Sequence, residues 1–292
     1  MLLSTFDRKR IDVGDVALQV AIGGDGPPLL LLHGYPETHL AWHAVAPRLA
    51  ERFTVVCPDL RGYGESDKPT GDEAHETYAK RTMARDVLTL MRTLGHERFA
   101  VAGHDRGGAV GYRLALDHPD AVARLAVLSI IPTIEMWSAL EGQAGLAAYH
   151  LYLLAQPADF PERLIGANPD QFLTHTLDGW CGTPGAIVSE ARTAYTSAFR
   201  DPRALHAICE DYRANASIDV AHDAADREAG TRIAAPLLAL WEQPEGFELP
   251  LDPLSIWRRW ADKVEGRGLP CGHFIPEERP DEVVDIFERF FA

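Results

Sequence analysis

A glycine-bounded turn about a third of the way along the chain joins a strand-like segment to a helical one. Residues 99–103 form a short apolar run, residues 108–116 have helical periodicity, and residues 103–107 read Gly-His-Asp-Arg-Gly. Glycines permit a tight turn and let the strand and helix backbones approach closely. The pattern therefore predicts that Asp105 stands above the carboxyl edge of a sheet, at the positive end of a helix.

Strand-like and helical segments alternate around this turn. The expected strands are 16–22, 29–32, 53–57, 99–103 and 125–131, and the expected helices are 82–94 and 108–116. The unbroken apolar run at 29–32 is typical of a strand that is buried on both faces. Alternating strands and helices with short connections predict a doubly wound, mostly parallel sheet of the α/β class.

The strand rhythm stops after Pro132 and returns at Pro236. Helical patterns such as 146–154 and 187–199 fill the interval, and a strand at 236–241 with helices at 253–264 and 281–291 completes the chain. We therefore expect an α/β core built from residues 1–132 and 233–292, with residues 133–232 inserted as a helical cap over an active site.

Charge and composition narrow the classes of function. The net charge of −15 disfavours nucleic-acid binding, which needs a basic face. The four cysteines lack the spacing of a zinc site or a disulfide framework. The chain also lacks a signal-like segment and any run of about 20 apolar residues. The sequence thus predicts a cytoplasmic protein that needs no metal and binds neither nucleic acid nor membrane.

Two further motifs lie where a nucleophilic aspartate would need them. His-Gly-Tyr-Pro at 33–36 follows a buried strand, and Gly-His-Phe at 272–274 precedes the last helix. The first motif predicts that the backbone N–H groups of Tyr35 and Arg106 form an oxyanion hole. The second supplies His273 as a general base. The order of nucleophile, acid and histidine along the chain is that of the α/β-hydrolase fold.

The residues at 33–38, 59–69 and 103–108 resemble those of haloacetate (fluoroacetate) dehalogenases and their epoxide hydrolase relatives. The segment between the strands is similar to the dehalogenases at 149–150, 154–157 and 209–214. The resemblance implies a hydrolase that acts on a small molecule, with Asp105 as nucleophile, no cofactor and a homodimeric assembly.

A carboxylate nucleophile determines the chemistry that is accessible. Asp105 should be ionised at neutral pH, given the reference pKa of about 3.9. It can displace a leaving group from sp³ carbon and form an ester, which water activated by His273 then hydrolyses. Carbon–halogen cleavage and epoxide opening both follow this scheme.

The chain departs from the dehalogenase pattern at the third catalytic residue, the carboxylate that would orient His273. The family has an aspartate directly after residues 125–128, whereas this chain has Ser129, which cannot carry the charge that stabilises an imidazolium. We expect the acid in the loop after the strand at 236–241, as in epoxide hydrolases, and assign it to Glu245. Glu242 and Asp252 are the alternatives.

The substrate pocket is conserved in part. Arg106 matches the first of two family arginines that bind the substrate carboxylate, and Ala109 replaces the second. Leu151 replaces the tryptophan of a His-Trp pair that, with a tyrosine, holds the halide. The other matches to substrate-binding positions are His150, Tyr212 and Trp180, although Trp180 is explained equally well by packing within the cap.

Three hypotheses follow for the function. The first is a haloacid dehalogenase, favoured by the resemblance in the cap. The second is an epoxide hydrolase, in which Tyr212 and either Tyr149 or Tyr152 would protonate the epoxide oxygen. The third is a non-catalytic, ligand-binding member of the fold, suggested by the lost family residues.

Overall fold

An eight-stranded sheet organises the molecule. The computed structural model describes residues 2–244 and 251–292. The order of the strands is β1-β2-β4-β3-β5-β6-β7-β8, and all pairs from β4 to β8 are parallel. The strands are β1 (Asp7–Asp12), β2 (Ala17–Gly23), β3 (Pro28–Leu32), β4 (Thr54–Pro58), β5 (Phe99–His104), β6 (Val122–Leu128), β7 (Leu237–Glu242) and β8 (Val264–Leu269). The predicted doubly wound, mostly parallel sheet is confirmed.

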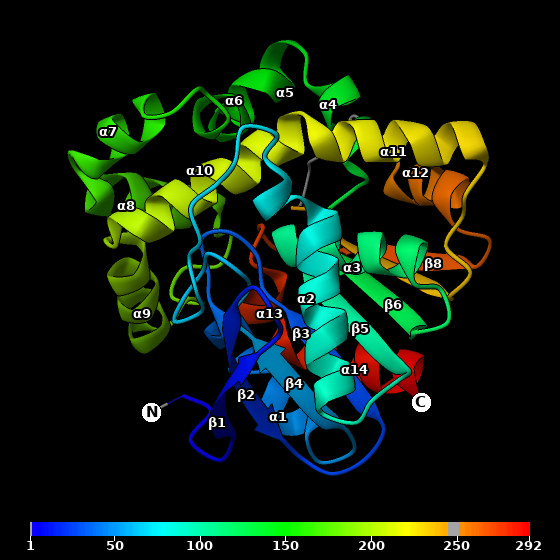
Figure 1. Cartoon of the computed structure of the whole chain (residues 1–292). Helices are drawn as coiled ribbons and strands as arrows, with labels where there is room; N and C mark the ends of the chain where they lie inside the picture. Colours follow the sequence, from blue (N-terminus) through cyan, green and yellow to red (C-terminus); the bar gives the residue numbers. More distant parts are fainter. Residues whose placement is uncertain (1, 245–250) are drawn as a thin grey trace.

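Helices cover both faces of the sheet (Figure 1). In β3, Leu30 and Leu32 face one apolar cluster, whereas Leu29 and Leu31 face another. The first cluster includes α2 (Lys80–Thr93), α3 (Arg106–Asp117) and α12 (Pro253–Trp260), and the second includes α1 (Ala46–Leu49), α13 (Ile275–Glu278) and α14 (Pro280–Phe291). Burial on both faces explains why the central strands are continuously apolar instead of alternating.

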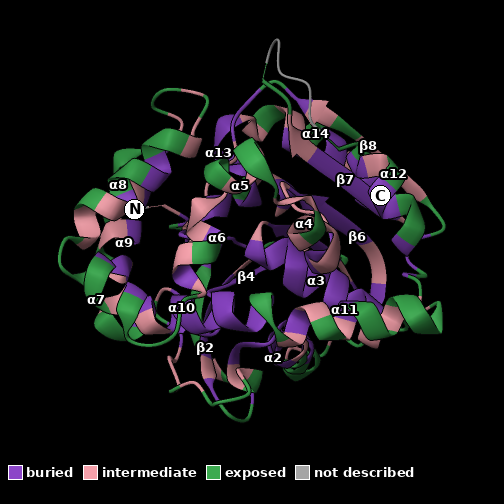
Figure 2. Ribbon diagram, turned by 90° about the horizontal axis from the view of Figure 1, so that it is seen from above, coloured by how far each residue is buried: buried purple, intermediate pink, exposed green. Residues whose placement is uncertain are grey.

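Helices fill the chain between β6 and β7, and we call residues 133–232 the helical segment. The helices of this segment are α4 (Thr133–Ala139), α5 (Gly142–Ala147), α6 (Tyr149–Leu154), α7 (Phe160–Gly166), α8 (Pro169–Trp180), α9 (Ser189–Phe199), α10 (Pro202–Ala216) and α11 (Ile218–Ala229). Figure 1 places them together at the top of the molecule, above the sheet. Figure 2 shows that α10 is the buried member, and every residue from 207 to 215 is buried.

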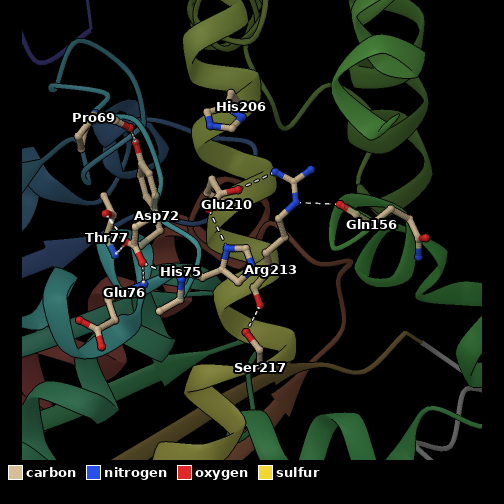
Figure 3. A network of polar contacts seen from close by, with 12 residues as sticks. Pro69, Asp72, His75, Glu76, Thr77, Gln156, His206, Glu210, Arg213 and Ser217 are labelled. Atoms are coloured by element: carbon tan, nitrogen blue, oxygen red, sulfur yellow. Dashed lines mark hydrogen bonds and ion pairs between the residues drawn. The ribbon is translucent and has the colours of Figure 1, made fainter. Parts of the chain in front are cut away.

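A network of charges holds α10 in place (Figure 3). The Arg213 guanidinium donates to Glu210 Oε1 at 2.8 Å, to the Gln156 carbonyl at 2.8 Å and to both oxygens of Glu162 at 2.7 and 2.9 Å. Glu210 Oε2 lies 2.9 Å from His75 Nδ1 in the loop before α2. These contacts tie α10 to its neighbours and to the core, so the side chains on its other side have a fixed register.

The structure corrects two predicted helices and adds one strand. The helix expected at 253–264 ends at Trp260, because Ala261 is extended and Val264 already begins β8. The helix expected at 146–154 is divided at Ala148. Strand β1 was not predicted, because it is a mostly exposed, highly charged edge strand without apolar alternation, held by pairing with β2.

The described residues contain neither a candidate membrane span nor a candidate metal-binding cluster. No helix there is long and apolar enough to cross a bilayer. No group of three or more His, Cys, Asp or Glu side chains there is arranged to hold a metal ion.

Candidate active site

The turn between β5 and α3 places Asp105 in a strained conformation. Its φ of 46° and ψ of −116° are rare for a residue with a side chain. A Cβ atom at Gly103 or Gly107 would collide with neighbouring backbone atoms, and one at Gly34 would lie 2.5 Å from the Cβ of Asp105. The glycines at these three positions therefore allow the loops after β3 and β5 to meet around one carboxylate.

The Asp105 carboxylate has one oxygen bound and one free. The backbone N–H of Tyr35 donates to Oδ1 at 2.7 Å, whereas Oδ2 lies 3.8 Å from His273 Nε2. No hydrogen bond from the backbone N–H of Arg106 to Asp105 is found within the described residues. Burial raises the pKa of Asp105, but His273, Arg106 and the Tyr35 N–H outweigh it and lower the pKa below its usual value. The group is therefore an anion at neutral pH, with Oδ2 available for attack.

The backbone of His273 is held by hydrogen bonds to residues from several parts of the chain. Its N–H donates to the Trp180 carbonyl at 2.9 Å. Its carbonyl accepts from His104 Nε2 at 2.8 Å and from Ser129 Oγ at 3.0 Å. Its buried Nε2 atom has no hydrogen-bond partner within the described residues. The imidazole is thus fixed beside Asp105, with one ring nitrogen free for a proton transfer.

Glu242 is the carboxylate that the described residues bring to the other ring nitrogen. It is the last residue of β7, and its Oε1 lies 3.9 Å from His273 Nδ1. Burial raises the pKa of Glu242, but His273 and the other hydrogen-bonding neighbours together outweigh burial, so the net shift is downward. Glu245, the predicted acid, lies outside the described residues. Asp252 caps α12 through Leu254 and Ser255.

Ser129 has a role that the sequence analysis missed. It stands at the end of β6, where the family carries its acid, and its hydroxyl binds the His273 carbonyl. It also lowers the pKa of Glu242 as a hydrogen-bonding neighbour. The sequence did contain a signal for Glu242. Strands β6 and β7 are parallel neighbours paired up to Leu128 and Leu240, so residues that follow these positions lie at the same edge of the sheet.

Arg106 lies next to the nucleophile with unused donors. Its side chain is 2% exposed, and neither Nε nor Nη2 has a hydrogen-bond partner among the residues that the structure describes. Its Cζ lies 4.7 Å from the centre of the Tyr212 ring, and Nε lies 3.7 Å from Asp211 Oδ2. Burial lowers the pKa of Arg106, yet Asp211, Tyr212 and Asp105 raise it well above the usual value. A permanent buried cation with free N–H groups is suited to bind an anion.

Aromatic rings enclose the space around Asp105. His150 lies 4.5 Å from Trp180 and 5.9 Å from Tyr212, and Trp180 lies 5.1 Å from His273, between ring centres. Burial lowers the pKa of His150 to about 3, although Asp105 acts in the opposite direction. His150 is therefore neutral, and its buried Nδ1 has no partner within the described residues. The predicted site residues His150, Tyr212 and Trp180 thus lie together.

The other two candidate tyrosines have different neighbours. Tyr152 is exposed, and its hydroxyl donates a hydrogen bond to the Leu140 carbonyl at 3.0 Å. Tyr149 packs against His150 and His175, with ring centres 6.1 Å apart in each case. Burial and the charge of Asp105 raise the pKa of Tyr212, and that charge acts in the same direction on the pKa of His150.

His104 and Glu37 form a buried ion pair behind the site, which the sequence analysis did not predict. His104 Nδ1 lies 2.8 Å from Glu37 Oε2, and Nε2 donates to the His273 carbonyl. Both ring nitrogens therefore face acceptors, as in an imidazolium. Burial lowers the pKa of His104, but Glu37 and Asp105 raise it to about 9.

This pair predicts a pH-dependent stability. The pKa of His104 is raised from 6.5 to about 9, so its contribution is complete below pH 6.5 and is lost as the pH rises through about 9. The contribution is on the order of 3 kcal/mol. In urea titrations, the free energy of unfolding should fall over this range in the natural protein and change much less in Glu37→Gln. If the free energy of unfolding depended on pH in the same way in both proteins, the ion pair of His104 and Glu37 would not be the source of the pH dependence.

Comparisons with known proteins agree with this geometry. A family model described as alpha/beta hydrolase fold matches residues 27–280. The chain is 44% identical over 289 residues to a fluoroacetate dehalogenase from Burkholderia sp., which covers 98% of this chain and 94% of the relative. It is 35% identical over 275 residues to a soluble epoxide hydrolase from Corynebacterium sp., covering 92% and 91%. The crystal structure of ALR0039 from Nostoc sp. PCC 7120 has a TM-score of 0.96 at 44% identity, covering 99% of both chains. Each of these matches includes the helical segment.

Proposed function

Because this chain belongs to the α/β-hydrolase fold family and is a hydrolase, we propose that it is a haloacid dehalogenase with Asp105 as its nucleophile. Small 2-haloacids such as chloroacetate are the proposed substrates. The helical segment acts as the cap that closes the site from above.

The observation that carries this proposal is the pairing of Tyr212 with His150 and Arg106. A neutral histidine and a phenol, with ring centres 5.9 Å apart, can both donate to a departing halide. Beside them, the free N–H groups of Arg106 can bind the carboxylate of the same substrate. A neutral epoxide has no carboxylate for this cation to bind, so the arrangement favours an anionic substrate.

The first step is displacement at carbon. Asp105 Oδ2 attacks the carbon that bears the halogen, the new C–O bond forms as the carbon–halogen bond breaks, and halide leaves with the bonding electrons. Oδ1 stays on the Tyr35 N–H throughout. The product of this step is an ester of Asp105.

The second step is hydrolysis of that ester. His273 Nε2, which has no partner in the described residues, takes a proton from water as the water attacks the Asp105 carbonyl carbon. The Tyr35 N–H stabilises the charge that develops on Oδ1. Glu242, at Nδ1, stabilises the imidazolium. The bond between the Asp105 carbonyl carbon and Oδ2 then breaks, and the imidazolium gives its proton to the departing alkoxide oxygen. The hydroxyacid leaves and Asp105 is regenerated.

The test is release of halide from chloro-, bromo- and fluoroacetate. We expect chloride and bromide release, with fluoride slower, because Leu151 offers no donor to the most strongly hydrated halide. Styrene oxide should give little diol, since the described site pairs Tyr212 with a histidine. Diol formation without halide release would instead identify an epoxide hydrolase, and the proposal would be wrong.

A further inference from the structure

A cluster of four buried charges adjoins the site. It consists of Arg106, Lys80, Asp211 and Asp219, whose side chains are all at most 3% exposed. Arg106 and Lys80 come from the core, whereas Asp211 and Asp219 come from α10 and α11 of the helical segment. Two cations and two carboxylates balance one another, as buried charges must.

Asp211 is at the centre of this cluster. Its Oδ1 forms a short ion pair with Lys80 Nζ, and its Oδ2 accepts a hydrogen bond from the Tyr63 hydroxyl at 2.8 Å. The same Oδ2 lies 3.7 Å from Arg106 Nε, too far for a hydrogen bond but close for a charge contact. Lys80 and Tyr63 therefore fix the carboxylate that faces Arg106.

Asp211 and Tyr212 confine the guanidinium from two directions. The carboxylate lies near Nε, and the Tyr212 ring lies across one face of the group. Both residues belong to α10, whose register is set by Glu210 and Arg213 (Figure 3). The donors at Nε and Nη2 stay unused, since the nearby carboxylate does not hydrogen-bond to them.

Asp105 is the other carboxylate that acts on Arg106. A guanidinium without Asp211 would be attracted to Asp105 alone and would pair with the nucleophile. Such a pair would occupy both the attacking oxygen and the anion-binding donors. The charge of Asp211 opposes that collapse.

We infer that Asp211 is a positioning residue that holds the Arg106 guanidinium away from Asp105 and keeps its donors open to the carboxylate of the substrate. Tyr63 supports this role by fixing Asp211 Oδ2. The inference rests on the proposed function in that Arg106 is taken to bind an anionic substrate.

Tyr63→Phe tests the inference with a small change. It removes the hydroxyl that fixes Asp211 and leaves every charge in place. Tyr78→Phe is the matched control, because Tyr78 is also buried and its hydroxyl makes one hydrogen bond, to the Pro69 carbonyl at 2.6 Å. Asp211→Asn is the stronger change, but it also leaves Lys80 with a weaker partner and should lower stability.

The first measurement compares chloroacetate with chloroacetamide, its neutral analogue. The ratio of kcat/KM for the acid to that for the amide should fall about fivefold in Tyr63→Phe, as expected for one lost hydrogen bond. It should fall further in Asp211→Asn and stay unchanged in Tyr78→Phe. A uniform loss for acid and amide, or an equal loss in Tyr78→Phe, would overturn the inference.

The second measurement is acetate binding by titration calorimetry, which needs no turnover. The affinity for acetate should fall about fivefold in Tyr63→Phe and more in Asp211→Asn, and match the natural protein in Tyr78→Phe. Equal acetate affinities in the natural protein and Tyr63→Phe would overturn the inference. If the natural protein binds acetate in this manner but releases no halide, the proposed reaction fails and the role of Asp211 stands.

Discussion

A His273→Gln variant mixed with chloroacetate should release one chloride per protein molecule and then stop. The displacement step uses only Asp105 Oδ2 and the substrate, so it does not need the imidazole. Hydrolysis of the ester does need it, because glutamine cannot accept the proton of the attacking water. Chloride release followed over time would therefore show a burst with almost no steady-state rate.

The control for this burst is Asp105→Asn. The amide is nearly the same size but carries no charge for the displacement, so neither burst nor turnover should occur. Repeated turnover in His273→Gln at a rate near that of the natural protein would contradict the role given to His273. A full burst in Asp105→Asn would contradict the role of Asp105.

Glu242→Gln should lower the steady-state rate by about 10³- to 10⁴-fold, the size of the effect when a triad acid becomes an amide. An amide cannot balance the imidazolium that forms as water attacks. The first chloride should still be released rapidly, because displacement precedes any use of the acid. The burst of chloride measures the displacement step, and the steady-state rate of chloride release measures hydrolysis of the ester.

Glu245→Gln is the matched comparison for this variant. Both substitutions replace a glutamate near the end of β7 by the same amide. If Glu242 is the acid, Glu245→Gln should change the rate by no more than about twofold, because neither chemical step would then use Glu245. A large loss in Glu245→Gln with a normal rate in Glu242→Gln would assign the acid to Glu245, as the sequence alone predicted.

The sheet and the Asp105 turn could be predicted because their signals are local. An unbroken apolar run such as Leu29–Leu32 indicates a strand buried on both faces, and the glycines around Asp105 indicate a turn that needs close backbone contact. The edge strand β1 carries no such signal, since its stability comes from pairing with β2 and not from side-chain burial.

The surroundings of the nucleophile depend on contacts between distant segments. Glu37 meets His104 across 67 positions, and Tyr63 meets Asp211 across 148. Neither pair has a spacing that a sequence pattern could reveal. The acid is a similar case, because no spacing in the sequence marks Glu242, the strand-end carboxylate 3.9 Å from His273 Nδ1, as a partner of that histidine.

The central claim is that Asp105 itself becomes esterified, and peptide mass spectrometry tests it directly. His273→Gln is treated with chloroacetate, quenched in acid and digested. We expect one carboxymethyl group on the peptide that contains Asp105, with fragmentation placing it on that residue. Chloride released without any modification of Asp105, or a carboxymethyl group on a different residue, would contradict the claim.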